Sequence, residues 1–244
     1  MAIRRELHDD GVVLLVLDRP ERRNALDADD LAVVHGFVAE AAADPATRVL
    51  VFTGAEGHLT AGADISAAVD TGFARDFAAF VAAVRAVPCP TICAAEGIAL
   101  GGGTQLAVSC DLRVATPDAR FGIPAAKLGL MIDQATVARL AAVAGQATAR
   151  GMLLGGEIVS GQRAFDVGLV QRLGHLDAAL AWAADLAALA PLSLAGHKVG
   201  LDRAADAEAT DDFAAAHARA WASDDLTEGF AAFRERRTPR FHGR

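Results

Sequence analysis

Three consecutive glycines, Gly101 to Gly103, lie between two apolar segments of the chain and shortly precede Gln105. Glycine loses more backbone freedom on folding than any other residue, so a triplet predicts a place where the backbone itself must be reached. The surrounding pattern indicates the end of a strand, a turn and a helix that begins near Gly103. Free N–H groups at a helix start point outward at its positive end and can hold a developing oxyanion. A plain tight turn with close packing is the alternative, and the triplet alone favours neither.

A second segment, "HLTAGADIS" from His58 to Ser66, also places small residues between a strand and a helix. One N–H group from this segment, together with that of Gly102, would form a pocket with two donors for a carbonyl oxygen. Taken alone, the segment is better explained as a strand-to-helix turn. The glycine stretch lacks both the Gly-Lys-Ser/Thr ending of a phosphate loop and the G-x-G-x-x-G spacing of a dinucleotide site, so neither is expected.

The elements that must position these segments follow from periodicity and breaker residues. Strands are expected over residues 2–7 and 11–18, and a helix with acidic residues at its start ends before Pro45. A buried strand, a long amphipathic helix up to Pro88 and another buried strand follow. After about residue 134 the pattern is almost wholly helical. Strands separated by helices, and then helices alone, predict an α/β core with a helical C-terminal part.

Composition excludes several classes of protein. The 244 residues fit one large α/β domain, and an apolar fraction of 53% supplies a sizeable core. Neither a run of about 18 uncharged apolar residues nor a signal-peptide pattern is present, so no membrane partner is expected. The formal net charge of −8 argues against a nucleic-acid partner. Three cysteines, spaced neither as a disulfide set nor as a metal site, indicate a reduced, cytoplasmic compartment and no bound metal.

Four ordered motifs and the tail together carry a more specific signal. The chain, with "DRPERRNAL", "AGADIS", "GIALGGGTQLAVSCDLRVA", "FGIPAAKLGL" and the tail "WASDDLTEGFAAFRERRTPRF", resembles the enoyl-CoA hydratase/isomerase (crotonase) superfamily over essentially its whole length. The resemblance implies an α/β, crotonase-like (ClpP/crotonase) spiral of β-β-α units over residues 1–190. It implies a C-terminal helical region over residues 191–244 that is used in trimerisation. Members commonly form homo-oligomers, either trimers or dimers of trimers.

The same resemblance implies the kind of ligand and the atoms that hold it. Members bind acyl-CoA thioesters and stabilise the thioester enolate in an oxyanion hole, with coenzyme A as part of the substrate and no separate cofactor. Carried over by position, the donors are the backbone N–H groups of Ala63 and Gly102. The loop Ala61 to Ile65, which includes Asp64, would cradle the adenine and pantetheine with its backbone.

Further contacts with coenzyme A are implied at both ends of the chain. Arg22 and Arg23 lie where the family contacts coenzyme A, and guanidinium groups pair well with phosphates. Phe233 and Arg236 match C-terminal positions that reach coenzyme A in some members. Solvated loop arginines and an ordinary amphipathic helix face are the respective alternatives.

Two positions depart from the family pattern. Hydratases carry one glutamate two residues after the glycine triplet and a second at the end of the motif F-G-x-P-E. Here these positions hold Gln105 and Ala125. An amide and a methyl group cannot exchange a proton at neutral pH, so ordinary hydration is not expected.

One titratable candidate remains, eight residues beyond Ala125. Asp133 occupies the place where dienoyl-CoA isomerases and a CoA-dependent dehalogenase of this superfamily carry a functional aspartate. It could shuttle a proton or act as a nucleophile, and the alternative is an N-terminal helix cap. His58 lies beside the predicted oxyanion loop, where a lone histidine is more often structural or exposed.

Two functions from different classes follow. The first is a hydratase/isomerase-type enzyme with Asp133 as its acid or base, and the second is a non-catalytic carrier or sensor of fatty acyl-CoA. A serine hydrolase with a similar core is disfavoured because no G-x-S-x-G elbow is present.

Overall fold

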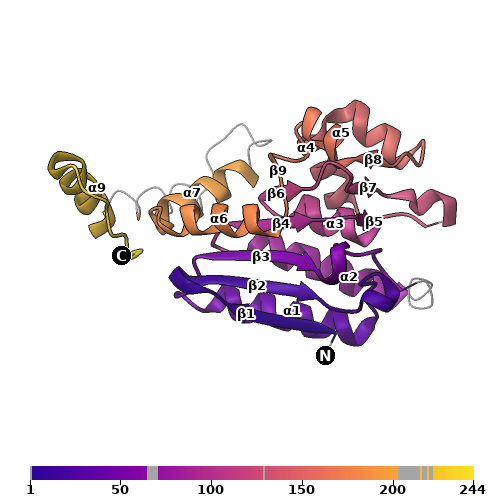
Figure 1. The fold of residues 1–244 in the computed structure, drawn as a ribbon, viewed down its shortest axis with the longest axis horizontal. Coiled ribbons are helices and arrows are strands. Elements are labelled where there is room, and N and C mark those ends of the chain that lie inside the picture. Colours follow the sequence, from indigo (N-terminus) through magenta and orange to yellow (C-terminus); the bar gives the residue numbers. More distant parts are fainter. Residues whose placement is uncertain (1, 65–70, 129, 203–214, 216–218, 220–221) are drawn as a thin grey trace.

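The N-terminal residues form the two predicted strands, which pair antiparallel, and the second strand continues into a parallel sheet (Figure 1). The structure is a computed structural model that describes residues 2–64, 71–128, 130–202, 215, 219 and 222–244. Within this part of the chain the main sheet follows the order β1 (Ile3–Leu7), β2 (Val12–Leu17), β3 (Val49–Gly54), β4 (Thr91–Ala95), β6 (Leu112–Ala115) and β9 (Arg172–Leu173). Every neighbouring pair after β1 and β2 is parallel.

Helices cover both faces of this sheet. Val13, Leu15 and Leu17 of β2 pack in one apolar cluster with the helices α1 (Ala28–Ala43), α2 (Thr71–Ala86), α3 (Gly102–Ser109) and α4 (Gln134–Leu153). The alternate residues of β2 pack in a second cluster with α6 (Leu176–Ala187). Because both faces are buried, the strands are continuous apolar runs without alternation.

A smaller sheet lies beside α3 and positions the start of that helix. It contains β5 (Ile98–Leu100), β7 (Arg120–Gly122) and β8 (Val159–Ser160) in that order. Strand β8 precedes α5 (Gly161–Asp166), and 3-10 turns occupy Asp9–Gly11, Pro20–Arg22, Ala55–Gly57 and Pro124–Leu128. The expectation of an almost wholly helical chain after residue 134 was therefore wrong at β8 and β9. Each of these strands has two residues and is defined by its pairing with a distant strand, which local periodicity cannot show.

The C-terminal helices differ in how closely they approach the sheet. Helix α7 (Pro191–Asp202) is tied to the core by Lys198, whose Nζ donates to Asp111 Oδ2 at 2.7 Å. Helix α9 (Asp224–Glu235) lies at one end of the long axis of the molecule, and the tail that follows returns to the body, where Arg48 donates to the Phe241 carbonyl at 3.2 Å (Figure 1). The division into residues 1–190 and 191–244 stays a prediction.

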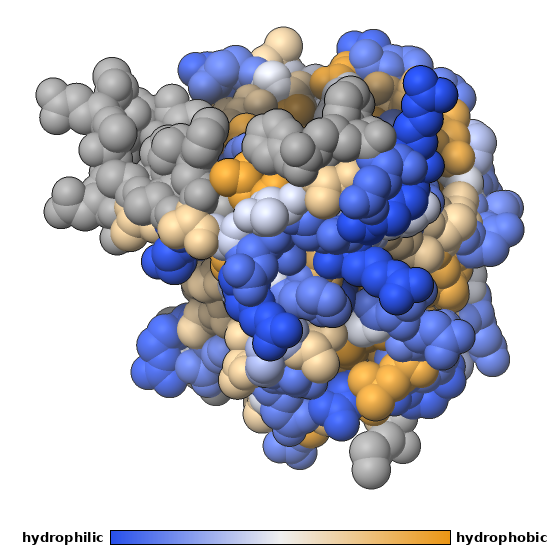
Figure 2. Space-filling model, turned by 90° about the vertical axis from the view of Figure 1, so that its left-hand side faces the viewer, coloured by the Kyte–Doolittle hydropathy of each residue, from blue (hydrophilic) through white to orange (hydrophobic). Residues whose placement is uncertain are grey.

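Apolar surface is distributed in patches among polar side chains on the face that carries α9 (Figure 2). In the described part of the chain, no single helix is both long and apolar enough to cross a membrane. The pair α6 and α7 passes that test only when counted together, and the two helices are bent by 110° relative to each other.

Candidate functional site

The two glycine-containing segments lie in backbone contact. A Cβ atom added to Gly62, which has φ +98°, would lie 2.7 Å from the Gly102 nitrogen. No side chain fits this approach, so Gly62 must be glycine. The Thr60 N–H donates to the Ile98 carbonyl at 3.0 Å, and the Leu100 N–H donates to the Thr60 carbonyl at 3.1 Å. The loop before α2 is thereby attached to the strand that leads into α3.

Several backbone N–H groups at this junction have no acceptor among the described residues, and those of Ala63 and Gly102 are two of them. On either side of Ala63, the Leu26 N–H donates to Gly62 and the Asp64 N–H donates to Leu26, both at 2.8 Å. Peptide groups alternate along extended chain, so the Ala63 N–H faces away from Leu26. Gly102 is the first residue of α3, where N–H groups lack an intrahelical acceptor.

Close packing explains the bare backbone of the glycine triplet. Gly101 has φ +55°, a Cβ at Gly102 would lie 2.7 Å from the Phe77 ring, and a Cβ at Gly103 would lie 2.5 Å from the Thr60 carbonyl oxygen. The Gly101 N–H donates to the Gly122 carbonyl at 2.8 Å. Packing therefore accounts for the triplet, and the same packing leaves the N–H group of the middle glycine unpaired within the described part of the chain.

Gln105 lies in the first turns of α3, and Ala125 lies in the 3-10 turn that follows β7. Gln105 lies one turn into the helix, where its N–H donates to the Gly101 carbonyl at 3.1 Å, and the residue is half-buried. Ala125 lies three residues after Gly122, the residue that accepts from Gly101, and packs against the core. Neither of the two replaced positions supplies a group that can exchange a proton.

Asp133 caps α4, one of the two roles that its sequence position left open. Its Oδ1 accepts from the Thr136 N–H at 2.9 Å and its Oδ2 accepts from the Thr136 hydroxyl at 2.6 Å. The residue is half-buried, and its charge favours the charged form of Arg85, whose pKa is nevertheless lowered, chiefly by burial. The capping interpretation is confirmed, and a role in proton transfer stays a prediction.

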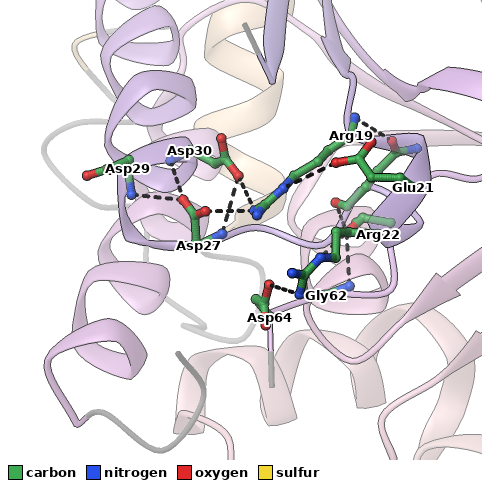
Figure 3. Close-up of polar contacts among 10 residues, drawn as sticks. Arg19, Glu21, Arg22, Asp27, Asp29, Asp30, Gly62 and Asp64 are labelled. Atoms are coloured by element: carbon green, nitrogen blue, oxygen red, sulfur yellow. Dashed lines mark hydrogen bonds and ion pairs between the residues drawn. The ribbon is translucent and has the colours of Figure 1, made fainter. Parts of the chain in front are cut away.

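Of the two arginines expected to meet phosphates, Arg22 ends the 3-10 turn Pro20–Arg22 (Figure 3), and Arg23 is the residue after it. Arg22 Nη1 lies 3.2 Å from Asp64 Oδ2, with the arginine side chain 58% exposed and the aspartate 11% exposed. Arg23 is exposed, and its carbonyl accepts from the Ala61 N–H at 2.9 Å. The basic segment is thus attached to the loop that contains Ala63.

A charged cluster fixes the same segment to the start of α1 (Figure 3). Arg19 Nη1 lies 2.7 Å from Asp27 Oδ2 and 2.9 Å from Asp30 Oδ2. Asp27 is the N-cap of α1, and the hydrogen bond from the Asp30 N–H, followed by the charge of Arg19, lowers its pKa. Burial raises the pKa of Asp30. The cluster supplies acceptors for the free N–H groups at the start of α1 and anchors the turn that contains Arg22 and precedes Arg23.

His58 has a structural role, in agreement with the interpretation favoured for a lone histidine. Its Nδ1 accepts from the Ile98 N–H at 3.2 Å, which places the proton of the neutral ring on Nε2. The ring also lies where a Cβ of Gly97 would be, so the histidine fills the space beside that glycine.

Sequence reasoning missed Asn24, which lies between the basic segment and the loop that contains Ala63. It is the only asparagine in the chain, is fully buried and has φ +57°. Asparagine tolerates the left-handed region better than most residues, so an asparagine after two arginines in a turn was an available signal.

The C-terminal candidates lie far from this junction within one chain. Helix α9, which contains Phe233 and precedes Arg236, is at the opposite end of the long axis from the start of α2 (Figure 1). Arg236 is exposed, with φ +54°. Ile65 lies outside the described residues.

Known proteins resemble this chain in both sequence and fold. Residues 8–244 match the protein family described as enoyl-CoA hydratase/isomerase. A relative from Mycobacterium leprae, named "Probable enoyl-CoA hydratase echA6", is 38% identical over 96% of this chain and 97% of its own length.

Solved structures superpose over the whole chain. An enoyl-CoA hydratase/isomerase family protein from Hyphomonas neptunium matches 100% of this chain and 98% of its own with a TM-score of 0.91 and 32% identity. The enoyl-CoA hydratase of Bacillus anthracis matches with a TM-score of 0.91 and 26% identity, over 100% of both chains. The protein therefore has the crotonase-like α/β fold and belongs to the enoyl-CoA hydratase/isomerase family.

Proposed function

We propose that this protein binds an acyl-CoA thioester and holds the thioester oxygen between the N–H groups of Ala63 and Gly102. The observation that carries the proposal is that these two donors lack acceptors among the described residues and lie on segments in backbone contact. Donors aimed at a carbonyl oxygen stabilise the negative charge that develops when the thioester becomes an enolate. Membership of the enoyl-CoA hydratase/isomerase family supports this class of ligand.

Within this proposal the protein does not hydrate enoyl-CoA at the rate of an enzyme with two glutamates. Addition of water to an alkene needs a group that takes a proton and a group that gives one. Gln105 and Ala125 do neither. Asp133 supplies a carboxylate, but both of its oxygens accept from Thr136. Binding of fatty acyl-CoA, with carriage or sensing as its purpose, is thus favoured over turnover.

The proposal extends to the rest of the ligand. Arg22 and Arg23 would pair with phosphates of coenzyme A, with Arg22 leaving Asp64 to do so, while the backbone of residues 61–65 holds the pantetheine and adenine. Helix α9 and the start of α2 lie at opposite ends of the long axis, so a contact from Phe233 or Arg236 would come from a second copy in a homotrimer or a dimer of trimers (Figure 1).

Removing the carbonyl from the ligand tests the proposal directly. Octanoyl-CoA and its thioether counterpart S-octyl-CoA differ only in that carbonyl group, and their dissociation constants can be compared by isothermal titration calorimetry. Two hydrogen bonds to the oxygen predict about tenfold tighter binding of octanoyl-CoA. Equal affinities would overturn the oxyanion assignment. Rapid hydration of crotonyl-CoA would overturn the prediction made from Gln105 and Ala125.

A further inference from the structure

Arg23 and Asn24 share a backbone conformation that is unfavourable for residues with side chains. Their φ angles are +52° and +57°, so two consecutive residues occupy the left-handed region. L-residues avoid this region because Cβ approaches the carbonyl oxygen, and such strain persists only where the surroundings enforce it. Most of the contacts that enforce it here involve Asn24, and the backbone of Arg23 makes the others.

The buried amide of Asn24 makes a complete set of contacts with two segments. Its Oδ1 accepts from the Arg19 N–H at 2.9 Å. Its Nδ2 donates to the Ala55 carbonyl at 3.0 Å and to the His58 carbonyl at 2.7 Å. The two amide protons donate to carbonyl groups, and the amide oxygen accepts from a backbone N–H. Only an amide side chain can satisfy all three partners.

The backbone of the same two residues continues the attachment toward Ala63. The Asn24 carbonyl accepts from the Thr60 hydroxyl at 2.6 Å, and the Thr60 oxygen accepts in turn from the Gly62 N–H at 2.9 Å. The Arg23 carbonyl accepts from the Ala61 N–H at 2.9 Å. Each residue from 60 to 62 is therefore bonded, directly or through Thr60, to residue 23 or 24.

We infer that Asn24 is a positioning residue that couples the recognition of coenzyme A phosphates at Arg22 and Arg23 to the geometry of the Ala63 donor. This inference rests on the proposed function. The strained turn presents the two arginines, and the bonds that stabilise this turn are the bonds that place the loop of Ala63 against Gly102. A ligand that reorders one segment must therefore act on the other.

Two substitutions separate positioning from folding. Asn24→Gly keeps a residue that adopts positive φ and removes the three amide contacts. Asn24→Asp keeps the acceptor for the Arg19 N–H and places a carboxylate against two carbonyl oxygens. In both variants we expect the preference for octanoyl-CoA over S-octyl-CoA to fall from about tenfold to below about threefold. The reason is that the N–H group of Ala63, which donates to the thioester oxygen, is displaced.

Thr53→Val provides a matched control. Thr53 is also buried, and its hydroxyl makes one hydrogen bond to the Ala94 carbonyl at 3.2 Å, away from residues 60–64. This variant should lose stability and keep the preference. A preference that persists in folded Asn24 variants, or that falls equally in Thr53→Val, would overturn the inference. Absence of any preference in the wild type would instead contradict the proposed function.

The single asparagine allows a second test that needs no variant. Selective ¹⁵N-asparagine labelling yields one pair of side-chain amide signals in the NMR spectrum, and they belong to Asn24. Adenosine 3′,5′-bisphosphate, the nucleotide end of coenzyme A, should shift this pair, and octanoyl-CoA should shift it further. Signals that do not move with a nucleotide that binds would overturn the coupling, whatever the acyl preference.

Discussion

Thr136 donates a hydrogen bond to each carboxylate oxygen of Asp133: its N–H donates to Oδ1 at 2.9 Å and its hydroxyl donates to Oδ2 at 2.6 Å. This geometry makes a specific prediction, because asparagine caps a helix as well as aspartate does but cannot act as an acid or base. Asp133→Asn should leave the free energy of unfolding within about 0.5 kcal/mol of wild type, whereas Asp133→Ala should lower it by about 1 kcal/mol. Urea denaturation measures both. A turnover activity present in the wild type and lost in Asp133→Asn would instead establish proton transfer or nucleophilic attack by this residue.

A methyl group at Gly102 should damage the proposed site more than it damages the fold. A Cβ there would lie 2.7 Å from the Phe77 ring and 3.1 Å from the Gly62 Cα, so the loop must move away from the helix. Gly102→Ala should weaken octanoyl-CoA binding by about tenfold and S-octyl-CoA binding far less, because only the former uses the donor pair. Gly36→Ala is the matched control: no atom lies within 4 Å of its added Cβ. Equal affinities of Gly102→Ala and wild type for octanoyl-CoA would contradict the assignment.

The ion pair between Lys198 and Asp111 should contribute strongly to the attachment of α7. Their side chains are 10% and 21% exposed, and Asp111 Oδ2 also accepts from the Thr91 N–H and hydroxyl. Lys198→Met leaves that carboxylate uncompensated and should lower the free energy of unfolding by about 2 to 3 kcal/mol. Arg4→Met removes two ion pairs, to Glu6 and to Asp18, at a side chain that is 49% exposed, and should cost less than about 1 kcal/mol. If the two variants lost the same free energy of unfolding, burial of the ion pair would not be the cause of the loss in Lys198→Met.

Local patterns predicted what local forces determine. The acidic residues before α1 predicted its start, and Asp27 and Asp30 form a capping box there. The glycine triplet predicted a turn between a strand and a helix, and β5 ends at Leu100 just before α3 begins at Gly102. By contrast, β9 has two residues and is defined by pairing with β6, and Lys198 meets a partner 87 residues away. Asn24 could not be predicted for the same reason, since its partners His58 and Ala55 are distant in sequence.

The part of the C-terminal tail at Arg240 should detach from α9 in acid. The Glu228 carboxylate accepts from the Arg237 guanidinium and from the Arg240 N–H, in that order of effect, and these bonds lower its pKa to about 2. A lowered folded-state pKa means that the contribution to stability is complete above the unfolded pKa of about 4.3 and is lost as the pH falls toward 2.

Hydrogen exchange of the Arg240 amide, corrected for intrinsic exchange, measures this detachment. Protection should fall between pH 4.3 and about 2 in the wild type. In Glu228→Gln it should be low throughout. Glu235→Gln removes a contact to Arg237 that does not involve the tail backbone and should leave the profile unchanged. Protection that is independent of pH in the wild type would exclude the Glu228 bond as the tether.

Restoring the two carboxylates tests what the pocket still lacks. Gln105→Glu adds a carboxylate one turn from the Gly102 donor, and Ala125→Glu adds a second next to the segment whose Gly122 accepts from Gly101. Because an alkene needs both proton transfers, the double variant should hydrate crotonyl-CoA on the order of a hundredfold faster than either single variant. Adding Gly102→Ala to the double variant should abolish the gain, since the enolate would lose a donor. If the double variant binds octanoyl-CoA as tightly as the wild type does and still fails to hydrate crotonyl-CoA, the missing carboxylates are not the sole obstacle. The acyl group must then lie differently from its position in a hydratase.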